Sequence, residues 1–322
     1  CGRSDDPTAS ASTDLPASAP PSGPAEPSDA SAASAPPPAP ALQRLPASAP
    51  LAERLNCLRE VGGALAIAHR GGPTRDFPEN AMETLDRTLG AGLRAMEVDV
   101  ATSRDGVLYL MHDDTLERTT TLEGEGREKT RDEIRAARLE TFAGPTEFSP
   151  PTLAQALEWA VRNDVLLELD KKRSSEFPPI IAAVREAGAE NHVLLITYSD
   201  DQAVEAHALA PDLAITATIR DAAQLDGLLA RGVRADTLLA WTGTEAPNPE
   251  LWRALAERGV ESIFGTLGPR GDRLDDVYWH DRDASEYDDL ARNGASFIVT
   301  DVSDRVARQL ADEQARAAAC GL

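Results

Sequence analysis

Residues 153–169 read LAQALEWAVRNDVLLEL, a helix pattern that runs directly into a strand pattern. Apolar residues recur at helical spacing through residues 153–160, which predicts an amphipathic helix with one buried face. Thr152 stands just before this helix, where its hydroxyl can accept a hydrogen bond from a backbone N–H and cap the helix start. The apolar run Val165–Leu169 that follows predicts a buried strand.

The same alternation recurs along the chain from residue 64 onward. The candidate strands are Ala64–Ala68, Ala95–Val100, Val107–Met111, Val165–Leu169, Val193–Thr197, Leu213–Thr218, Thr237–Trp241, Ser262–Phe264 and Ser296–Thr300. The helical patterns are Ala81–Ala91, Leu153–Arg162, Pro178–Ala187, Gln202–Ala208, Ala222–Arg231, Pro249–Arg258 and Glu286–Asn293. Strands that alternate with helices predict an α/β fold with a parallel sheet and right-handed crossovers.

The fold class we predict from this order is a TIM-like (β/α)8 barrel. A barrel of this class closes with eight strands, and one of the candidates is therefore surplus. The run Val107–Met111 follows Ala95–Val100 through a short Asp105-Gly106 turn that leaves no room for a crossover helix, so we expect an irregular barrel near this point. The sequence does not decide which strand is surplus, and an open doubly wound sheet is the alternative fold.

Residues 1–50 differ sharply in composition from the rest of the chain. They hold 12 of the 23 prolines, are otherwise rich in Ala and Ser, and contain no aromatic residue. Such a segment buries too little apolar surface to offset the entropy of ordering it, so we predict a disordered linker over residues 1–50 and a barrel domain over residues 51–322.

The first residue, Cys1, is typical of a mature bacterial lipoprotein, in which the cysteine carries lipid and a disordered spacer follows. The alternative is an arbitrary boundary of the chain. The expected location is the cell envelope, lipid-anchored at the periplasmic face of a bacterial membrane or on the cell surface. No run of about 18 apolar residues is present to predict a membrane-spanning helix.

Cys57 precedes the first predicted strand, and Cys320 lies close to the end of the chain. The two ends of a barrel chain tend to meet, so a Cys57–Cys320 disulfide is plausible in an oxidising compartment. The alternative is two unpaired thiols.

The formal net charge of the chain is −22. A field of that sign repels nucleic acids and anionic lipid surfaces, which argues against nucleic-acid binding. An anionic substrate would need a local positive site, and this requirement favours a bound cation. Most of the carboxylates are interpreted as a solvated acidic surface.

Polar residues interrupt or end the apolar strands in a recurring way. His69 and Arg70 follow the first strand, at the carboxyl end where α/β folds place reactive groups. Glu97 and Asp99 alternate with apolar residues, so both carboxylates lie on one face of their strand. Buried acids are costly unless they are paired or bind a metal, and two hard oxygen ligands suit Ca²⁺ or Mg²⁺.

Two further strands end with comparable groups. His112 ends the strand that follows the Glu97 and Asp99 pair, and two histidines beside a metal-bound phosphate could serve as acid and base. Glu168, Asp170 and Lys172 share one face of the strand beginning at Val165 by the same period of two. A third carboxylate could complete a metal site, and the lysine could meet phosphate charge. The plainer interpretations are a structural buried histidine at His112 and, at residues 166–172, a strand that ends in a charged turn.

Together these motifs resemble the pattern of the glycerophosphodiester phosphodiesterase family, within the phospholipase C-like superfamily of TIM-barrel phosphodiesterases. The resemblance covers about residues 64–308 and is densest over residues 64–121. The segments that carry it are His69-Arg70, Pro78-Glu79-Asn80, Glu97-x-Asp99, His112-Asp113, Thr115–Thr120, Pro151-Thr152-Leu153 and Val299-Thr300-Asp301.

The resemblance implies an enzyme that uses one divalent cation, Ca²⁺ or Mg²⁺, to hydrolyse glycerophosphodiesters to sn-glycerol 3-phosphate and an alcohol. By position, it implies acid–base catalysis by His69 and His112, phosphate binding by Arg70 and Lys172, and metal binding by Glu97, Asp99 and Asp170, with Glu168 as the alternative third ligand. The expected partners are the small-molecule substrate and a membrane reached through lipid on Cys1, with no protein partner.

Two alternative functions remain open from the sequence. The first is a phospholipase D-like or lysophospholipid phosphodiesterase of the same superfamily. The second is a surface lipoprotein that binds phosphodiesters without turnover. A non-catalytic descendant is expected to lose at least one histidine or acid of the site, and none is missing here.

Overall fold

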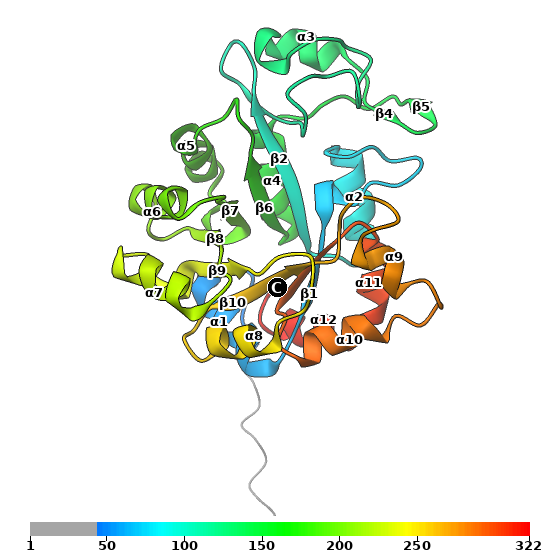
Figure 1. The fold of residues 1–322 in the computed structure, drawn as a ribbon. Helices are drawn as coiled ribbons and strands as arrows, with labels where there is room; N and C mark the ends of the chain where they lie inside the picture. The colour runs from blue at the N-terminus through cyan, green and yellow to red at the C-terminus, as the bar shows by residue number, and fades with distance from the viewer. Residues whose placement is uncertain (1–43) are drawn as a thin grey trace, which may run out of the picture. The chain divides into compact units, whose positions relative to one another are not determined.

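Eight parallel strands close into a barrel in the computed structural model, which describes residues 44–322 (Figure 1). The strands are β1 (Leu65–Ala68), β2 (Ala95–Thr102), β6 (Leu166–Lys171), β7 (Val193–Ile196), β8 (Ala214–Thr218), β9 (Leu238–Trp241), β10 (Glu261–Gly265) and β11 (Phe297–Thr300). Each strand pairs with its neighbour, and β1 pairs in parallel with both β11 and β2, which closes the sheet. The predicted barrel is therefore confirmed, and the open doubly wound sheet is excluded.

The surplus strand of the sequence pattern is β3 (Leu108–Leu110). It pairs antiparallel with the carboxyl end of β2 and takes no part in the barrel ring. It opens an excursion that carries α3 (Arg131–Ala136), β4 (Glu140–Thr141) and β5 (Gly144–Pro145). This excursion stands at the upper end of the molecule in Figure 1 and has a small apolar cluster of its own around Tyr109, Leu116 and Ile134. No crossover helix fits the short turn between β2 and β3, which explains the irregularity.

The helices packed around the barrel include all seven predicted ones. These are α2 (Met82–Gly90), α4 (Leu153–Asn163), α5 (Phe177–Ala187), α6 (Asp200–Leu209), α7 (Ala222–Ala230), α8 (Pro249–Ala256) and α10 (Ser285–Arg292). Sequence patterns did not predict α1 (Leu51–Val61), α9 (Leu274–Tyr278), α11 (Ser303–Gln309) or α12 (Ala311–Ala319). At α4, the Thr152 side chain accepts a hydrogen bond from the Gln155 backbone, so the predicted cap is confirmed.

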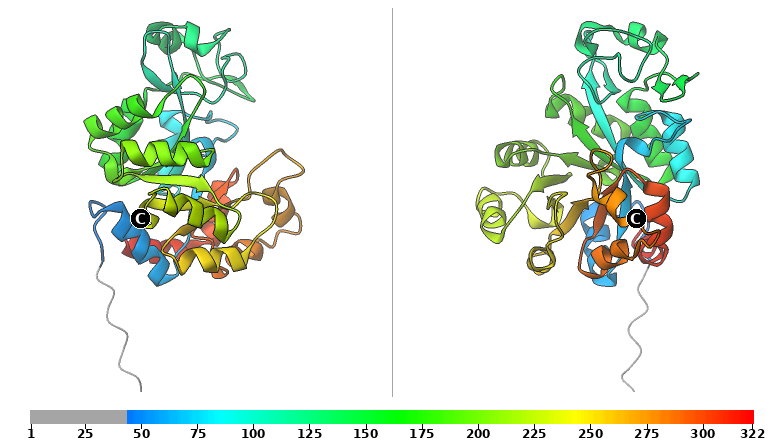
Figure 2. Two further views of the ribbon diagram at one scale, coloured as in Figure 1. Left: turned by 60° about the vertical axis from the view of Figure 1, so that its left-hand side comes forward. Right: turned by 45° about the vertical axis from the view of Figure 1, so that its right-hand side comes forward.

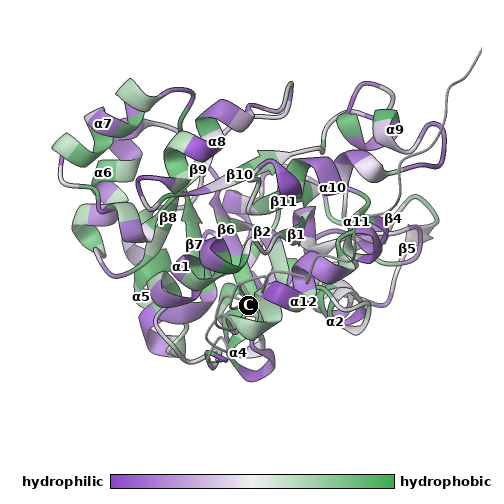
Figure 3. Ribbon diagram, turned by 90° about the horizontal axis from the view of Figure 1, so that it is seen from below, coloured by the Kyte–Doolittle hydropathy of each residue, from purple (hydrophilic) through white to green (hydrophobic). Residues whose placement is uncertain are grey.

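The barrel strands bury two distinct sets of side chains because successive residues point to opposite faces. In β2, Met96 and Val98 pack outward with the surrounding helices, whereas Ala95 belongs to the apolar cluster inside the barrel. Figure 3 shows apolar strands within and polar helix faces outside. Glu97 and Asp99 therefore point inward, as the period of two predicts.

The two ends of the described chain meet at the lower end of the barrel, where α1 and α12 lie (Figures 1 and 2). A disulfide joins Cys57 of α1 to Cys320, with 5.6 Å between their Cα atoms, so the predicted pairing is present. Arg54 of α1 is buried and donates to the backbone carbonyls of Asn191 and Gly321 at 2.7 and 2.6 Å. The disulfide and the contact with Gly321 join the two ends of the described chain, and the contact with Asn191 joins α1 to the residues just before β7.

Residues 1–43, with the predicted lipid anchor at Cys1 and most of the predicted linker, lie outside the described residues. The linker, its boundary with the barrel domain at residue 50, and the expected envelope location all stay predictions. In residues 44–322, none of the helices has the length and apolar character needed to cross a membrane.

Candidate functional site

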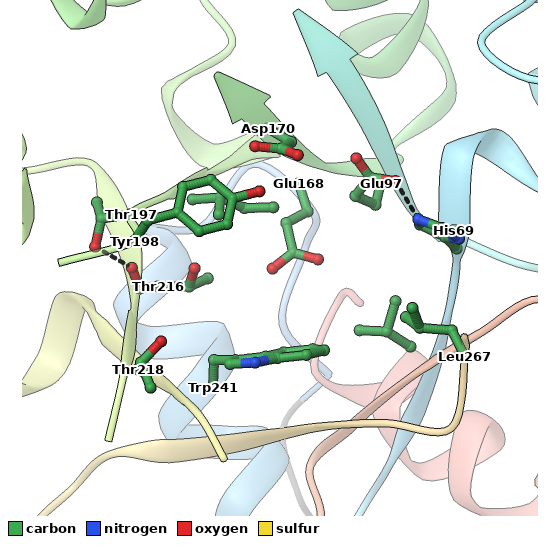
Figure 4. A pocket seen from close by; sticks show the side chains of 12 residues that line it. His69, Glu97, Glu168, Asp170, Thr197, Tyr198, Thr216, Thr218, Trp241 and Leu267 are labelled. Atoms are coloured by element: carbon green, nitrogen blue, oxygen red, sulfur yellow. Dashed lines mark hydrogen bonds and ion pairs between the residues drawn. The ribbon is translucent and has the colours of Figure 1, made fainter. Parts of the chain in front are cut away.

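A cavity of about 210 Å³ opens among the carboxyl ends of the barrel strands (Figure 4). Its polar wall is formed by His69 after β1, Glu97 from β2, and Glu168 and Asp170 from β6. The opposite wall is largely apolar and carries Ile196, Thr197, Tyr198, Thr216, Thr218, Trp241, Leu267 and Val299. The cavity thus places charged groups against one side of a ligand and carbon-rich surface against the other.

Carboxylates from two neighbouring strands converge at the polar wall. The parallel register of β2 and β6 sets Glu97 beside Glu168 and Asp99 beside Asp170. Ligand oxygens of Glu97, Asp99 and Asp170 all lie within 4.8 Å of one another, and all three residues are buried. Glu168 lines the cavity below them but does not belong to this close group.

The electrostatics of these carboxylates reflect their burial and crowding. Burial, followed by the nearby charges of Asp99 and Asp170, raises the pKa of Glu97 well above its ordinary value. Burial and the neighbouring Asp170 also raise the pKa of Glu168 to about 8. Although burial opposes it, Lys172 and His112 lower the pKa of Asp99 on balance. Concentrated negative charge of this kind is stabilised by a cation.

The donor set fits a hard divalent cation. Carboxylate oxygens are the ligands that Ca²⁺ and Mg²⁺ prefer, and these three converge from two rigid strands. Asp170 also keeps one buried oxygen, Oδ1, without a hydrogen-bond partner in the described part of the chain. A buried carboxylate oxygen normally has a partner, so this atom is poised to accept a ligand.

Two neighbours hold Asp99 and Asp170 in place. The Lys172 ammonium donates to Asp99 Oδ1 at 2.9 Å and to Asp170 Oδ2 at 3.0 Å. The Asn80 side-chain amide donates to Asp99 Oδ2 at 2.7 Å, and its carbonyl accepts from the Asp99 backbone N–H. Asn80 adopts the left-handed backbone region, with φ of 58°, which asparagine tolerates better than most residues.

His69 is oriented by an acid that directly follows the last barrel strand, β11. Its Nδ1 lies 2.7 Å from Asp301 Oδ1, while its Nε2 lies 3.9 Å from Glu97 Oε2. Asp301 also accepts from Arg273 at 2.8 Å and from the Gly268 backbone at 3.2 Å. Although burial opposes it, the His69 partner helps lower the pKa of Asp301 to about 2. An ionised Asp301 thus fixes the Nδ1 hydrogen, which leaves Nε2 free to exchange a proton near the carboxylates.

His112 has an equivalent partner on its own loop. Its Nδ1 lies 2.5 Å from Asp113 Oδ1, and Arg118 donates to the other oxygen of Asp113. Arg118 helps lower the pKa of Asp113 to about 2 against the effect of burial, so this acid is also ionised. His112 is partly exposed and close enough to Asp99 to influence its pKa.

Arg70 contacts the acids of this region through both its backbone and its side chain. Its backbone N–H donates to Glu97 Oε2 at 2.7 Å, and its guanidinium donates to both oxygens of Glu79 at 3.1 Å. Arg118 donates to the same Glu79 carboxylate. Arg70 has a φ of 54°, a left-handed conformation that is strained for arginine and turns the chain sharply after β1.

The structure brings most of the predicted residues to one region, but it adds partners that the sequence did not single out for a role. Asp301, Glu79, Asp113 and Arg273 are of this kind. Asp301 directly follows β11, so the strand-end rule that drew attention to His69 could have found it. Arg273 lies in a loop with no comparable signal in the sequence.

The model of the glycerophosphoryl diester phosphodiesterase family matches residues 69–264, which span the strands and loops that carry this site. The chain belongs to the glycerophosphoryl diester phosphodiesterase family. Two curated relatives are a Bacillus subtilis protein named YqiK, 31% identical over 154 residues, and a glycerophosphodiester phosphodiesterase of Caldanaerobacter subterraneus, 30% identical over 161 residues. The matches cover 46% and 47% of this chain and 63% and 65% of those relatives, so the chain spans less than two thirds of their length.

Solved structures extend the family likeness over more of the barrel. A glycerophosphoryl diester phosphodiesterase from Parabacteroides distasonis is 26% identical with a TM-score of 0.70, over 84% of this chain and 93% of that one. An Oleispira antarctica phosphodiesterase, solved with the product sn-glycerol-3-phosphate, shares the fold at 21% identity and a TM-score of 0.60, over 79% and 99% of the two chains.

Proposed function

We propose that this chain hydrolyses glycerophosphodiesters to sn-glycerol 3-phosphate and an alcohol with the help of one divalent cation. The observation that carries the proposal is the convergence of Glu97, Asp99 and Asp170 at the wall of the cavity that His69 also lines. Such a constellation suits phosphoryl-transfer chemistry, which needs charge neutralisation and proton transfer at the same point.

The substrate class rests on family membership and on relatives. The Caldanaerobacter relative is named a glycerophosphodiester phosphodiesterase, and the Oleispira structure holds sn-glycerol-3-phosphate as its product. The cavity offers a polar wall for the phosphodiester and an apolar wall, with Trp241 and Leu267, for the carbon skeleton. These features favour a small phosphodiester over a polymer.

Glu97, Asp99 and Asp170 are the proposed ligands of the cation, which is either Ca²⁺ or Mg²⁺. When bound, the cation supplies Lewis-acid polarisation of the phosphoryl oxygens. Arg70 and Lys172 are the proposed phosphate-binding cations, since a guanidinium and an ammonium both stabilise phosphate charge. Both are already positioned by carboxylates, Arg70 by Glu79 and Lys172 by Asp99 and Asp170.

His69 and His112 are the proposed acid–base pair. One imidazole removes a proton from the attacking oxygen, and the other protonates the leaving alkoxide. The attacking oxygen is either that of water or the neighbouring hydroxyl of the substrate, and in the second case a cyclic phosphate forms that water then opens to sn-glycerol 3-phosphate. Asp301 and Asp113 keep the Nδ1 hydrogens in place and stabilise the charged form of each ring.

The test is hydrolysis of glycerophosphocholine by the purified chain, followed through release of sn-glycerol 3-phosphate, with Ca²⁺ or Mg²⁺ and with a chelator. We expect activity with cation, loss of activity with chelator, and recovery when cation is returned. His69→Ala and His112→Ala should each lower kcat by about 10²–10⁴-fold, the usual effect of losing a general acid or base.

A matched control is His280→Ala, because His280 is exposed and lies outside the cavity. It should leave kcat unchanged. Full activity of the His69 and His112 variants, or activity that a chelator does not affect, would refute the proposed chemistry. Binding of glycerophosphocholine without turnover would favour the non-catalytic alternative.

A further inference from the structure

Three arginines surround a surface hollow away from the catalytic carboxylates. The hollow has a volume of about 590 Å³ and is lined by Trp279, Arg282, Arg305, Arg308 and Gln309. None of these residues lines the catalytic cavity. Figure 1 shows α11, which carries three of them, and α9, which the other two follow, on one side of the barrel.

Two segments distant in sequence build this hollow. Arg305, Arg308 and Gln309 are spaced three and four residues apart on α11, so they share one helix face. Trp279 and Arg282 follow α9 on the opposite side. The Arg305 guanidinium carbon lies 5.5 Å from the centre of the Trp279 ring, in a cation–π contact that gives the arginine a defined position.

The three arginines of this hollow have no direct ion-pair partner within the described residues 44–322. Arg282, Arg305 and Arg308 donate no side-chain hydrogen bond and form no ion pair there, although the whole chain carries 54 acids against 32 Lys and Arg. The acids nearby do not pair with these arginines, although Asp281 and Asp283 flank Arg282 in sequence. Asp304 pairs with Arg87, and Asp288 accepts a hydrogen bond from Gln309 at the edge of the hollow.

We propose that this hollow binds a phosphate group at a site distinct from the catalytic cavity. Guanidinium groups present paired N–H donors that match phosphate oxygens, and an anion between the three would offset their mutual repulsion. The hollow is large enough for a phosphate ester, and Trp279 supplies a flat apolar surface beside the charge. The phosphate is either that of a soluble ester or that of a lipid head group.

The test begins with calorimetric titration of inorganic phosphate into the full chain at low ionic strength. In the Arg305→Gln/Arg308→Gln variant we expect phosphate affinity at the hollow to fall by at least about tenfold, because two charge-assisted contacts are lost. Arg282→Gln, which changes the segment after α9, should lower the phosphate affinity of the hollow by a smaller factor. Arg70→Gln, titrated in parallel, should still bind phosphate at the hollow with unchanged affinity. This result would distinguish binding at the hollow from binding in the catalytic cavity.

The matched control is Arg135→Gln/Arg253→Gln, which removes the same charge from two exposed arginines on α3 and α8. It should leave phosphate affinity within about twofold, since neither arginine lines the hollow. If the two double variants lose affinity equally, or if wild type binds neither phosphate nor vesicles, the proposed site does not exist.

Cosedimentation with phosphatidylglycerol vesicles identifies the source of the phosphate. Arginine-dependent binding to these vesicles would support a lipid head group. Arginine-dependent binding of inorganic phosphate without vesicle binding would support a soluble ester. Vesicle binding that persists in the Arg305→Gln/Arg308→Gln variant, together with unchanged phosphate affinity, would overturn the proposal.

Discussion

At the scale of single residues, the choice between Asp170 and Glu168 decides how the proposed metal site is built. Both side chains point into the barrel from β6, two residues apart. Only Asp170 lies in the close group with Glu97 and Asp99, and only Asp170 has a buried oxygen without a partner in the described residues. Glu168 lies below this group, where burial raises its pKa to about 8.

We therefore expect Asp170→Asn to weaken cation affinity by about a hundredfold, since changes in outer partners of a metal site already cost about 10–100-fold. Glu168→Gln, the matched control, should change cation affinity by less than about tenfold. The measurement is the cation concentration that gives half-maximal hydrolysis. The reverse order of the two effects would make Glu168 the third ligand.

At the scale of elements, α1 is tied to the barrel by an ion pair between Arg59 and Glu261 of β10. Glu261 is almost fully buried, and burial raises its pKa to about 7 despite the opposing effect of Arg59. Between about pH 4.5 and about pH 7 the folded chain thus holds a proton that the unfolded chain has released. The free energy of unfolding must fall as pH rises through that window.

The prediction concerns wild type compared with Glu261→Gln, which cannot titrate. The free energy of unfolding of wild type minus that of the variant should decrease by about 3 kcal/mol from pH 4.5 to pH 7.5, and should then stay constant. Denaturant unfolding at several pH values measures this difference. A constant difference across the window would show that Glu261 has an ordinary pKa in the folded chain.

The start of α4 gives a second prediction at this scale. Thr152 accepts from the Gln155 backbone, and the Gln155 side chain accepts from the Thr152 backbone, so each residue satisfies a donor of the other. Thr152→Ala should lower the free energy of unfolding by about 1 kcal/mol, whereas Thr152→Ser, which keeps the hydroxyl, should lower it by less. Chemical denaturation of both variants tests this. Equal losses of unfolding free energy in the two variants would show that side-chain packing, and not the hydroxyl cap, stabilises the start of α4.

Local sequence patterns predict elements well where burial is periodic. The alternation in β2 and the helical stripe of α4 depend on side chains only a few residues apart, so pattern alone suffices. By contrast, α9 has only five residues, too few for a periodic signal, and α12 consists mostly of Ala and polar residues. The excursion after β3 lacks the alternation of strand and helix that marks the barrel. For that reason its small apolar cluster was not predicted.

At the scale of the whole molecule, local sequence patterns predict the residues of the site but not the contacts between them. Strand-end rules predict that His69, Glu97, Asp99, His112 and Asp170 belong to one end of the barrel. They do not predict that His69 meets Asp301, because this contact joins residues 232 positions apart and depends on barrel closure. The partners of charged groups are set by tertiary packing, which local patterns do not contain.

The disulfide is the longest-range covalent link in the described chain. Cys57 and Cys320 are separated by 263 residues, so the link restricts nearly the whole unfolded barrel. Replacing both cysteines with Ser should lower the free energy of unfolding by about 2–5 kcal/mol, measured by denaturant titration. Because the link lies at the end of the barrel opposite the site, kcat at 25 °C should not change. Loss of kcat with intact folding would contradict this separation.

The most direct test of the central claim is a crystal structure of the chain grown with Ca²⁺. We predict one cation bound by oxygens of Glu97, Asp99 and Asp170 at about 2.3–2.6 Å, beside His69. Well-ordered carboxylates with no cation between them at saturating Ca²⁺ and again at saturating Mg²⁺, or a cation bound only elsewhere, would contradict it.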